Sequence, residues 1–440
     1  MFIGLRNKKG SALITVFLVI TVLLVLSAAF VSVAISHSRA TERFKNRTVA
    51  FQTAEAGLDH AFAWLQYRPV PPAGILVNPW EAAGAPTLIG GGNYTVIITK
   101  LVSPTGDSSI IRYSLTSSGS FAGATRVLTS YVQTSSFARY IWFTNGETYN
   151  GTAVWFWSLD YLDGLVHTNG HFNIYKNPVF AGAVSSADDY IRYYNNGNNI
   201  NLSQTSNPPH DLPNFQQGIN LGAYPIVMPN KATKLRNAAA CGGLTLTGNT
   251  TVVLKDDGTM DVTNADNNWN NTNRPLPDNG ALFVTGGNLT IEGTLSGQLT
   301  AGAENDIIIS DNIVYADDPR ANAASTDVMG IVSEGDVVID DSASGPGGNL
   351  EINACVMALN DSFMLESYWI GPAQGTLTVY GGIIQEERGP IGTFNAKANT
   401  QISGYAKNYT YDLRLLGFPP PFMPTTGDYD ILAWEDNNKL

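Results

Sequence analysis

The sequence predicts an α+β fold: a long N-terminal helix with a small antiparallel sheet, followed by a parallel β-helix (solenoid) head. Three observations lead to this prediction. An apolar run without charge, Pro or Gly extends from Ser11 to Ser36, and no proline follows until Pro69. Three segments rich in β-branched residues then lie between residues 94 and 133. From about residue 240 to 403, short apolar segments alternate with Gly, Asn and Asp turns.

Chain length indicates how many folded units to expect, and net charge limits the possible partners. A chain of 440 residues exceeds one ordinary core, so two or three folded units are expected. Charged residues make up 14% of the chain and the formal net charge is −12, which argues against nucleic-acid binding. The predicted segments are a leader at 1–10, the helix at 11–68, the antiparallel sheet at 69–135, an aromatic and Asn-rich region at 136–235, the β-helix at 236–403 and a C-terminal cap at 404–440.

The predicted helix has two halves of unlike character. Its polar second half repeats an apolar residue every seventh position, as one buried helix face requires: Phe44, Phe51, Leu58 and Leu65. At ~1.5 Å per residue the whole helix is on the order of 80 Å long, more than a bilayer needs. The apolar first half is compatible with a cleaved signal peptide or an uncleaved signal anchor. A buried core helix fits poorly, because the run is apolar on every face.

Two motifs in this helix resemble those of type IV pilins. KKGSALITVFLVITVLLVL resembles a class III leader with its apolar helix, and AFQTAEAGLDHAF (residues 50–62) resembles a segment of PilX-type minor pilins. The resemblance implies that a prepilin peptidase cleaves between Gly10 and Ser11 and that Ser11 becomes the methylated N-terminus. The residues that match the pilin helix motif are Ala54, Glu55, Ala56, Gly57 and Leu58.

One position departs from the pilin pattern. The fifth residue after the expected cleavage site is Thr15, where major pilins usually have Glu. In a filament that carboxylate is expected to pair with the N-terminal amine of a neighbouring subunit, and a low dielectric strengthens the pair. Since Thr15 lacks the carboxylate, the chain is expected to be a minor or tip subunit rather than the repeating one.

The region 136–235 is rich in aromatic residues. A candidate ligand platform comprises Trp155, Trp157, Tyr161 and His167, because aromatic rings can stack on sugar faces; burial in a core is the alternative. His167 and His171 have the spacing of a metal-ligand pair on a helix, but the Asn-Gly between them favours a strand and a turn. No metal site is therefore predicted, and calcium binding by the Asp and Asn loops is left open.

The region 236–403 carries a repeat. Equivalent apolar segments recur at intervals of 25 to 27 residues, as at Ile331 and Val356, Val338 and Met364, and Leu350 and Leu377. A period in the mid-twenties with three strands per period is what one coil of a parallel β-helix requires. A β-sandwich, which also gives many short strands, is the alternative.

Catalytic residues are not evident in this region. Carboxylates are frequent but fall mainly at turns, and Arg320 and Arg388 are the only arginines between residues 275 and 403. A polysaccharide-cleaving enzyme would need a carboxylate pair, or calcium with a basic residue, on one face. We therefore predict no enzyme activity and no cofactor. Cys241 and Cys355 are compatible with either a disulfide or two buried thiols.

The C-terminal part carries a second resemblance. GGIIQEERGPIG (381–392) and YTYDLRLL (409–416), together with DGLVHTNG (163–170), look like parts of a β-helical domain of unknown function found on bacterial surface proteins with pilin-like N-termini. The prolines at 419–421 cannot pair in a central strand. The tail is therefore predicted to cap the open end of the solenoid with Phe418, Phe422, Tyr429 and Trp434.

The resemblances imply a minor or tip subunit of a type IV pilus or pseudopilus, with a β-solenoid head for pilus assembly, adhesion or surface interaction. The implied partners are other pilin subunits, prepilin peptidase, the inner membrane, and a surface glycan or protein ligand, but no nucleic acid. The implied location is the bacterial inner membrane before assembly and the pilus or cell surface afterwards. The alternative is a membrane-anchored envelope protein with a carbohydrate-binding or polysaccharide-cleaving β-helix.

Overall fold

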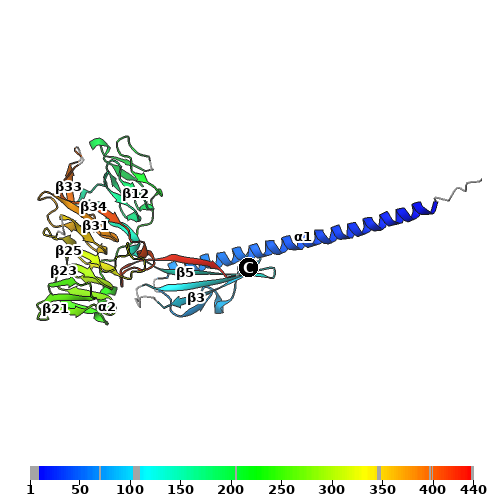
Figure 1. The fold of residues 1–440 in the computed structure, drawn as a ribbon, viewed down its shortest axis with the longest axis horizontal. Helices are drawn as coiled ribbons and strands as arrows, with labels where there is room; N and C mark the ends of the chain where they lie inside the picture. Colours follow the sequence, from blue (N-terminus) through cyan, green and yellow to red (C-terminus); the bar gives the residue numbers. More distant parts are fainter. Residues whose placement is uncertain are drawn as a thin grey trace, which may run out of the picture. The chain divides into compact units, whose positions relative to one another are not determined.

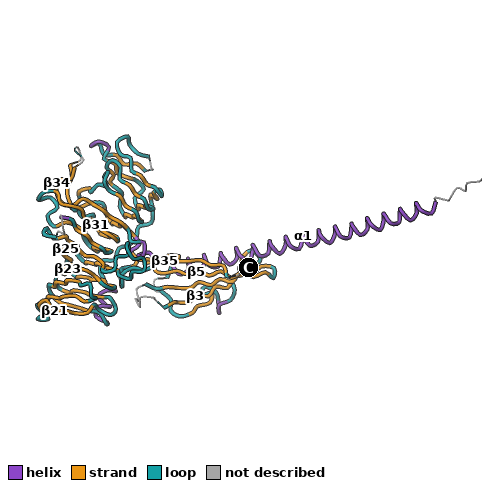
Figure 2. Tube along the Cα trace, in the orientation of Figure 1, coloured by secondary structure: helices purple, strands orange, loops and turns teal. Residues whose placement is uncertain are grey.

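The computed structural model describes residues 9–68, 71–102, 110–203, 206–343, 348–395, 398 and 400–437. Its contacts divide the chain into two compact units. The helix unit comprises Met1–Leu101, Tyr113–Val132 and Ile431–Leu440, and the head unit comprises Val102–Arg112 and Gln133–Asp430. Figures 1 and 2 show one long helix in the helix unit and mostly strands in the head unit.

Helix α1 (Lys9–Gln66) is one continuous helix of 58 residues, so the long N-terminal helix is present. It ends shortly before Pro71 and Pro72, which cannot continue a helix. Its buried apolar side chains lie in the second half, at spacings of three and four residues that place them on one face: Ala50, Ala54, Leu58, Ala61 and Leu65. Of the predicted seventh-residue repeat, Leu58 and Leu65 are buried, whereas Phe44 is 73% exposed.

The helix packs on a six-stranded sheet with the order β1-β3-β4-β5-β35, in which β2 also pairs with β3. The strands are β1 (Ile75–Val77), β2 (Thr87–Ile89), β3 (Gly92–Leu101), β4 (Arg112–Phe121), β5 (Ala124–Ser136) and β35 (Thr425–Asp436). A two-residue turn joins β4 to β5, and Ala122 and Gly123 both have positive φ there, as tight hairpins require. The three segments predicted between residues 94 and 133 lie in β3, β4 and β5, and the C-terminal strand β35 completes the edge.

The head unit contains a ten-stranded sheet in which every described pairing is parallel. In spatial order its strands are β17 (Ile219–Leu221), β13 (Val184–Ser186), β10 (Leu165–Thr168), β6 (Tyr140–Gly146), β32 (Gly382–Glu387), β29 (Cys355–Ala358), β26 (Val328–Ser333), β24 (Gln298–Ala303), β22 (Ala281–Thr285) and β18 (Leu244–Thr247). Strands β26 and β29 are buried along their whole length, which is typical of parallel sheets covered on both faces.

A second large sheet of eleven strands mixes both directions. Its main path is β21 (Trp269–Pro275), β20 (Thr259–Asn264), β19 (Thr250–Leu254), β23 (Leu289–Leu295), β25 (Ile307–Tyr315), β28 (Leu350–Ile352), β31 (Ala373–Tyr380), β34 (Thr400–Thr410) and β33 (Gly392–Asn395), with β27 (Val337–Ile339) and β30 (Phe363–Leu365) off this path. The outer pairs β19–β20, β20–β21 and β33–β34 are antiparallel. From β22 to β34 the chain passes repeatedly between the two large sheets, in places with two consecutive strands in the eleven-stranded sheet. The inward side chains of both sheets belong to one apolar core.

Smaller elements complete the head unit. Two three-stranded sheets have the orders β11-β14-β15 and β16-β12-β9, and β7 pairs with β8. Their strands are β7 (Thr148–Tyr149), β8 (Thr152–Ala153), β9 (Tyr161–Leu162), β11 (Asn173–Ile174), β12 (Val179–Phe180), β14 (Ile191–Tyr193), β15 (Ile200–Leu202) and β16 (Asn214–Phe215). Helix α2 (Thr233–Ala240) packs on β18, β22 and β24.

The predicted parallel β-helix head is wrong. The described residues form many strands in several separate sheets, and no closed solenoid is found among them. The 25- to 27-residue intervals do correspond to parallel pairs, including Ile331 with Val356 and Leu350 with Leu377. These intervals identify strands that pair in parallel, but they do not show whether the resulting sheets close into a solenoid. The intervals also do not reveal the antiparallel hairpins at the edges of the second sheet, or the long-range placement of β6 beside β32.

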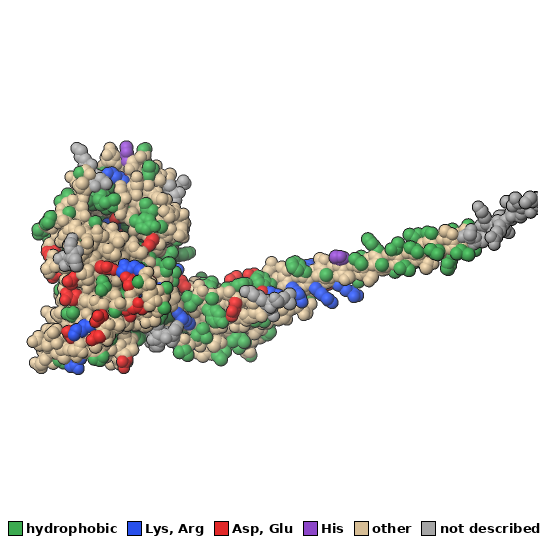
Figure 3. All heavy atoms as spheres, viewed as in Figure 1, with side chains coloured by type: hydrophobic (Ala, Val, Ile, Leu, Met, Phe, Trp, Pro, Cys, Tyr) green, Lys and Arg blue, Asp and Glu red, His purple; other side chains and the backbone are tan. Residues whose placement is uncertain are grey.

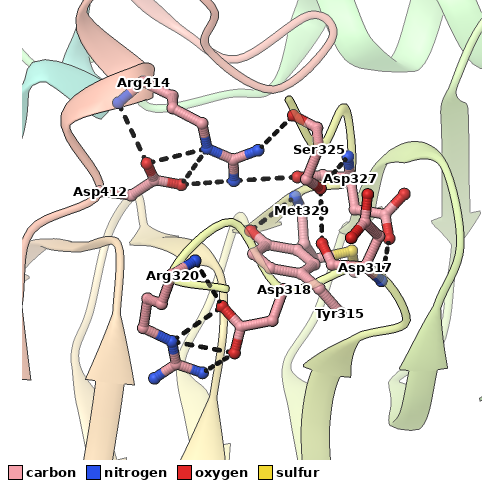
Figure 4. A network of polar contacts seen from close by, with 9 residues as sticks. All are labelled: Tyr315, Asp317, Asp318, Arg320, Ser325, Asp327, Met329, Asp412 and Arg414. Atoms are coloured by element: carbon pink, nitrogen blue, oxygen red, sulfur yellow. Dashed lines mark hydrogen bonds and ion pairs between the residues drawn. The ribbon is translucent and has the colours of Figure 1, made fainter. Parts of the chain in front are cut away.

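The tail was expected to cap the end of a solenoid, but it covers a face of the ten-stranded sheet. Pro419 to Pro424 are buried, and the Pro421 carbonyl accepts a hydrogen bond from Thr300 of β24. Arg414 fastens the preceding turn, because its guanidinium donates to the Asp412 carboxylate and to the carbonyls of Ser325 and Asp327 (Figure 4). The chain then continues into β35, so its last strand belongs to the small sheet.

Candidate functional site

The first half of α1 is an apolar surface. Every described residue from Ala12 to Ser36 is exposed, including Phe17 at 73% and Phe30 at 77%. By length and composition this is the one helix in the described part of the chain that could cross a membrane. Figure 3 shows hydrophobic side chains around this end of the helix. An uncovered apolar surface of this kind requires either lipid or other apolar helices around it.

The predicted processing residues lie at the start of this surface. Gly10 and Ser11 belong to the first turns of α1, while the preceding leader residues 1–8 lie outside the described residues. Thr15 is exposed on the apolar stretch. Gly10, Ser11 and Thr15 are therefore close together in one helical segment, far along the chain from the AEAGL motif.

A band of basic side chains follows the apolar surface. Arg39, Arg43, Lys45 and Arg47 are all exposed, and no ion pair of these four is found within the described ranges. Figure 3 shows Lys and Arg side chains along this part of the helix. Basic side chains at the end of an apolar helix are typical of a membrane–water boundary.

The AEAGL motif has a packing role in the second half of α1. Ala54 and Leu58 are buried on the sheet, Gly57 faces Tyr94 and Ser117, and Ala56 is half-buried. A Cβ on Gly119 of β4 would come closer than 3.0 Å to backbone atoms of Ala50 and Ala54. Small residues on both elements thus allow helix and sheet to approach closely.

Glu55 of the motif lies in a shallow groove. It forms this groove with Asp59, Phe62, Leu115 and Trp434, and the volume is about 270 Å³. Glu55 and Asp59 are four residues apart on the helix, a spacing at which like charges repel. No ion pair of either carboxylate is found in the described part of the chain.

The structure brings together only two of the four residues of the predicted ligand platform. Trp155 and Trp157 line one cavity of the head unit, whereas Tyr161 lines a smaller one beside it. Trp157 is buried and stacks on Phe394, with ring centroids 4.3 Å apart. Trp155 is half-buried and meets Tyr194 edge-on.

His167 is a core residue of the ten-stranded sheet. It is buried, and its ring stacks on Phe143 of the adjacent strand β6. Its Nε2 lies 2.9 Å from Asn169 Oδ1, which can only accept, so Nε2 carries the proton; its Nδ1 lies 2.7 Å from the Ser185 hydroxyl. Burial lowers the pKa of His167, and the Asn169 hydrogen bond opposes this only in part.

The two histidines do not form a pair. His171 instead contacts Asp188 and stacks on Tyr190. Among the described residues there is no group of three or more His, Cys, Asp or Glu side chains that could hold a metal ion. Cys241 is exposed and Cys355 is buried, and both are free thiols. Burial raises the pKa of Cys355, so its thiol stays protonated.

A chain of four charged side chains, three of them buried, lies in the head unit beside Trp155 and Trp157. Arg388 Nη1 lies 3.0 Å from Glu147 Oε2, Arg388 Nη2 lies 3.7 Å from Asp160 Oδ2, and Lys407 Nζ lies 2.9 Å from Asp160 Oδ1. The charges alternate in sign and sum to zero. Burial lowers the pKa of Lys407, and Asp160 opposes this shift. We refer to these four residues as the charge chain.

Neighbouring groups satisfy the charge chain. Glu147 Oε1 accepts hydrogen bonds from Thr144 and from the Trp142 indole. The Arg388 guanidinium lies over the Phe156 ring, 3.8 Å from its centroid. Of these four residues, only Arg388 was noted from the sequence, because arginines are scarce in that region. Its contact with Glu147 could not be inferred from the sequence, since the two residues are 241 positions apart.

The charge chain borders the cavity lined by Trp155 and Trp157. This cavity has a volume of about 330 Å³. Its walls come from the loop before β9, the segment after β32, and strands β33 and β34. Of the charge chain, Lys407 is the most exposed, with 22% of its side chain accessible.

Comparisons with known proteins give partial matches. The model of a domain of unknown function (DUF4900) matches residues 93–188, which include DGLVHTNG but only a minor part of the chain. No curated protein matches the sequence. A solved structure, the competence-associated pilin ComZ from Thermus thermophilus, is similar at 12% identity over 89% of this chain and 98% of that chain, with a TM-score of 0.36. So low a TM-score supports no conclusion by itself.

Proposed function

We propose that this chain is a minor or tip subunit of a type IV pilus or pseudopilus, whose head mediates assembly, adhesion or other surface interactions. One observation carries the proposal: α1 is a single helix whose exposed first half is apolar and whose second half packs on a sheet. The pilin-like leader and AEAGL motif lie on this same helix.

The proposed role explains the exposed apolar surface of α1. Before assembly the segment from Ser11 to Ser36 lies in the bacterial inner membrane, with Arg39 and Arg43 at the boundary. On assembly the same surface exchanges lipid for the helices of other pilin subunits. Thr15 provides no carboxylate for a neighbour's N-terminus, which favours a minor subunit.

Mass spectrometry of the mature N-terminus tests this proposal. We expect cleavage by prepilin peptidase after Gly10 and an N-methylated Ser11 in protein isolated from the native host. An intact Met1, or a cut after about residue 30 as in an ordinary signal peptide, would overturn it. A Gly10→Ala variant is expected to accumulate uncleaved, while Gly4→Ala, within the leader but away from the cleavage site, is expected to be processed normally.

The proposed function includes no catalysis. The buried carboxylates Glu147 and Asp160 are already bonded to cations and to N–H donors, an arrangement that supports a structural role. The competing function is a permanently anchored envelope protein with a carbohydrate-binding or polysaccharide-cleaving head. Turnover of bacterial polysaccharides by the purified full chain, measured as release of reducing ends, would contradict our proposal.

A further inference from the structure

The cavity of the head unit offers an aromatic wall. Trp155 is its half-buried indole, and Trp157 and Phe394 form a stacked pair beside it with an interplanar angle of 18°. The faces of aromatic rings carry partial negative charge, which attracts C–H groups of partial positive charge. A volume of about 330 Å³ fits one or two small rings rather than a long chain.

Two polar groups of the cavity retain hydrogen-bonding capacity. Lys407 has three N–H donors, and its one acceptor within the described ranges is Asp160. Gln401 donates through Nε2 to the carbonyls of Ser403 and Gly404, while its Oε1 accepts no hydrogen bond from the described residues. Lys407 and Gln401 therefore present a charged donor and an acceptor next to the aromatic wall.

We propose that this cavity binds a neutral hexopyranose ring, with the C–H face of the sugar on Trp155 and its hydroxyls bonded to Lys407 and Gln401. A hydroxyl both accepts and donates, so it suits both groups. An anionic ligand is disfavoured because Asp160 already neutralises Lys407. A purely apolar ligand would leave Lys407 and Gln401 desolvated and unpaired, at a cost. This inference deepens the adhesive part of the proposed function and rests on it for its biological role.

The test is calorimetric titration of the full chain, purified in a detergent without sugar head groups. The probes are methyl glucoside and methyl galactoside, with glucuronate as the anionic and indole as the aromatic comparison. We expect at least one methyl hexoside to bind saturably and the two comparison compounds not to. Trp155→Ala and Lys407→Met should each weaken binding about tenfold or more, the loss expected for one hydrogen bond to a charged group or one stacked ring.

Controls separate binding from folding. Trp369→Ala removes an exposed indole of the head unit that does not line the cavity, and it should bind normally. Lys407→Arg keeps the charge and the donors and should retain part of the affinity. The inference is overturned if neither hexoside binds, if glucuronate or indole binds more tightly, or if Trp369→Ala weakens binding as much as Trp155→Ala. The N-terminus of the same preparation is read by mass spectrometry, so failure here is distinct from failure of the pilus proposal.

Discussion

At the scale of single residues, the charge chain places ionised groups inside the head unit. Glu147 and Arg388 are almost fully buried, and burial of an ion costs several kcal/mol unless partners replace its water. Protein groups replace most of this water, since the Glu147 carboxylate accepts hydrogen bonds from Thr144, Trp142 and Arg388. These residues hold the wall of the cavity in place, because Arg388 also donates to the Trp155 carbonyl.

Arg388→Met is expected to lower the free energy of unfolding by about 3–5 kcal/mol, because it leaves Glu147 buried without its cation. Urea unfolding of the full chain in detergent, followed by tryptophan fluorescence, measures the change. The matched control is Arg320→Met, which removes exposed ion pairs with Asp318 and Glu351 and should cost at most about 1 kcal/mol. Equal effects of the two variants would contradict a structural role for the charge chain.

The pKa of His167 makes the stability of the head unit depend on pH. Burial holds this pKa below its ordinary value, so the unfolded chain binds the proton more readily than the folded chain. The stabilisation is complete above the unfolded pKa of about 6.5 and is lost as pH falls from there through the lower folded pKa.

Urea midpoints at pH 7.5 and pH 5.5 test this dependence. We expect His167→Asn to reduce the loss of stability between the two pH values relative to the unmodified chain. His210→Asn, at an exposed histidine of the same unit, serves as the control and should leave the pH dependence unchanged. An unchanged slope for His167→Asn would show that the buried imidazole does not set the pH response.

At the scale of elements, α1 is held to its sheet by small residues. Ala50 and Ala54 on the helix meet Gly119 on β4, where no side chain intervenes. The same helix has large exposed apolar side chains before residue 36. One element thus combines a closely packed half with a half that needs an external apolar partner.

Gly119→Ala is expected to destabilise the helix unit by about 1–3 kcal/mol, the range observed when packed contacts are overfilled. The added Cβ would overlap backbone atoms, which cannot rotate away as a side chain can. Gly417→Ala is the control, since a Cβ there has no heavy atom within 4 Å, and its effect should stay within about 0.5 kcal/mol. Equal thermal midpoints for the two variants would refute the close approach.

At the scale of the whole molecule, the chain joins a helix with an exposed apolar half to a head with a large buried core. The head alternates between two large sheets, and its core runs from Phe137 to Met423. In the proposed filament only α1 has to change its surroundings, from lipid to protein. The head can stay folded throughout, because the side chains of its apolar core are already buried.

Thr15→Glu is expected to increase the number of copies of this chain in purified filaments, because the carboxylate can pair with a neighbour's N-terminus in a low dielectric. Quantitative mass spectrometry of sheared filaments from the native host measures the copy number. Thr15→Gln has nearly the same shape without the charge and should leave the copy number unchanged. An increase with Gln, or none with Glu, would argue against an electrostatic reason for the minor role.

The sequence alone determined the features that depend on neighbouring residues. Absence of charge and Pro between Ser11 and Ser36, with prolines at 69–72, determined the extent of α1. Alternating β-branched residues likewise determined β3, β4 and β5, because the sequence pattern of neighbouring residues is enough to specify these strands. The intervals between apolar segments determined which later strands pair in parallel, but not the architecture they build.

Only the tertiary structure decided what depends on distant parts of the chain. It placed β6 beside β32, which joins early and late strands in one ten-stranded sheet, and β35 beside β5 in a separate sheet. Among the described residues the strands form several sheets and no closed solenoid. In the folded chain Lys407 contacts Asp160, which is 247 residues away in the sequence. His167 is buried in the core and does not line the cavity of Trp155 and Trp157. No local pattern encodes such contacts, because their free energy arises only when burial of the whole core brings the partners together.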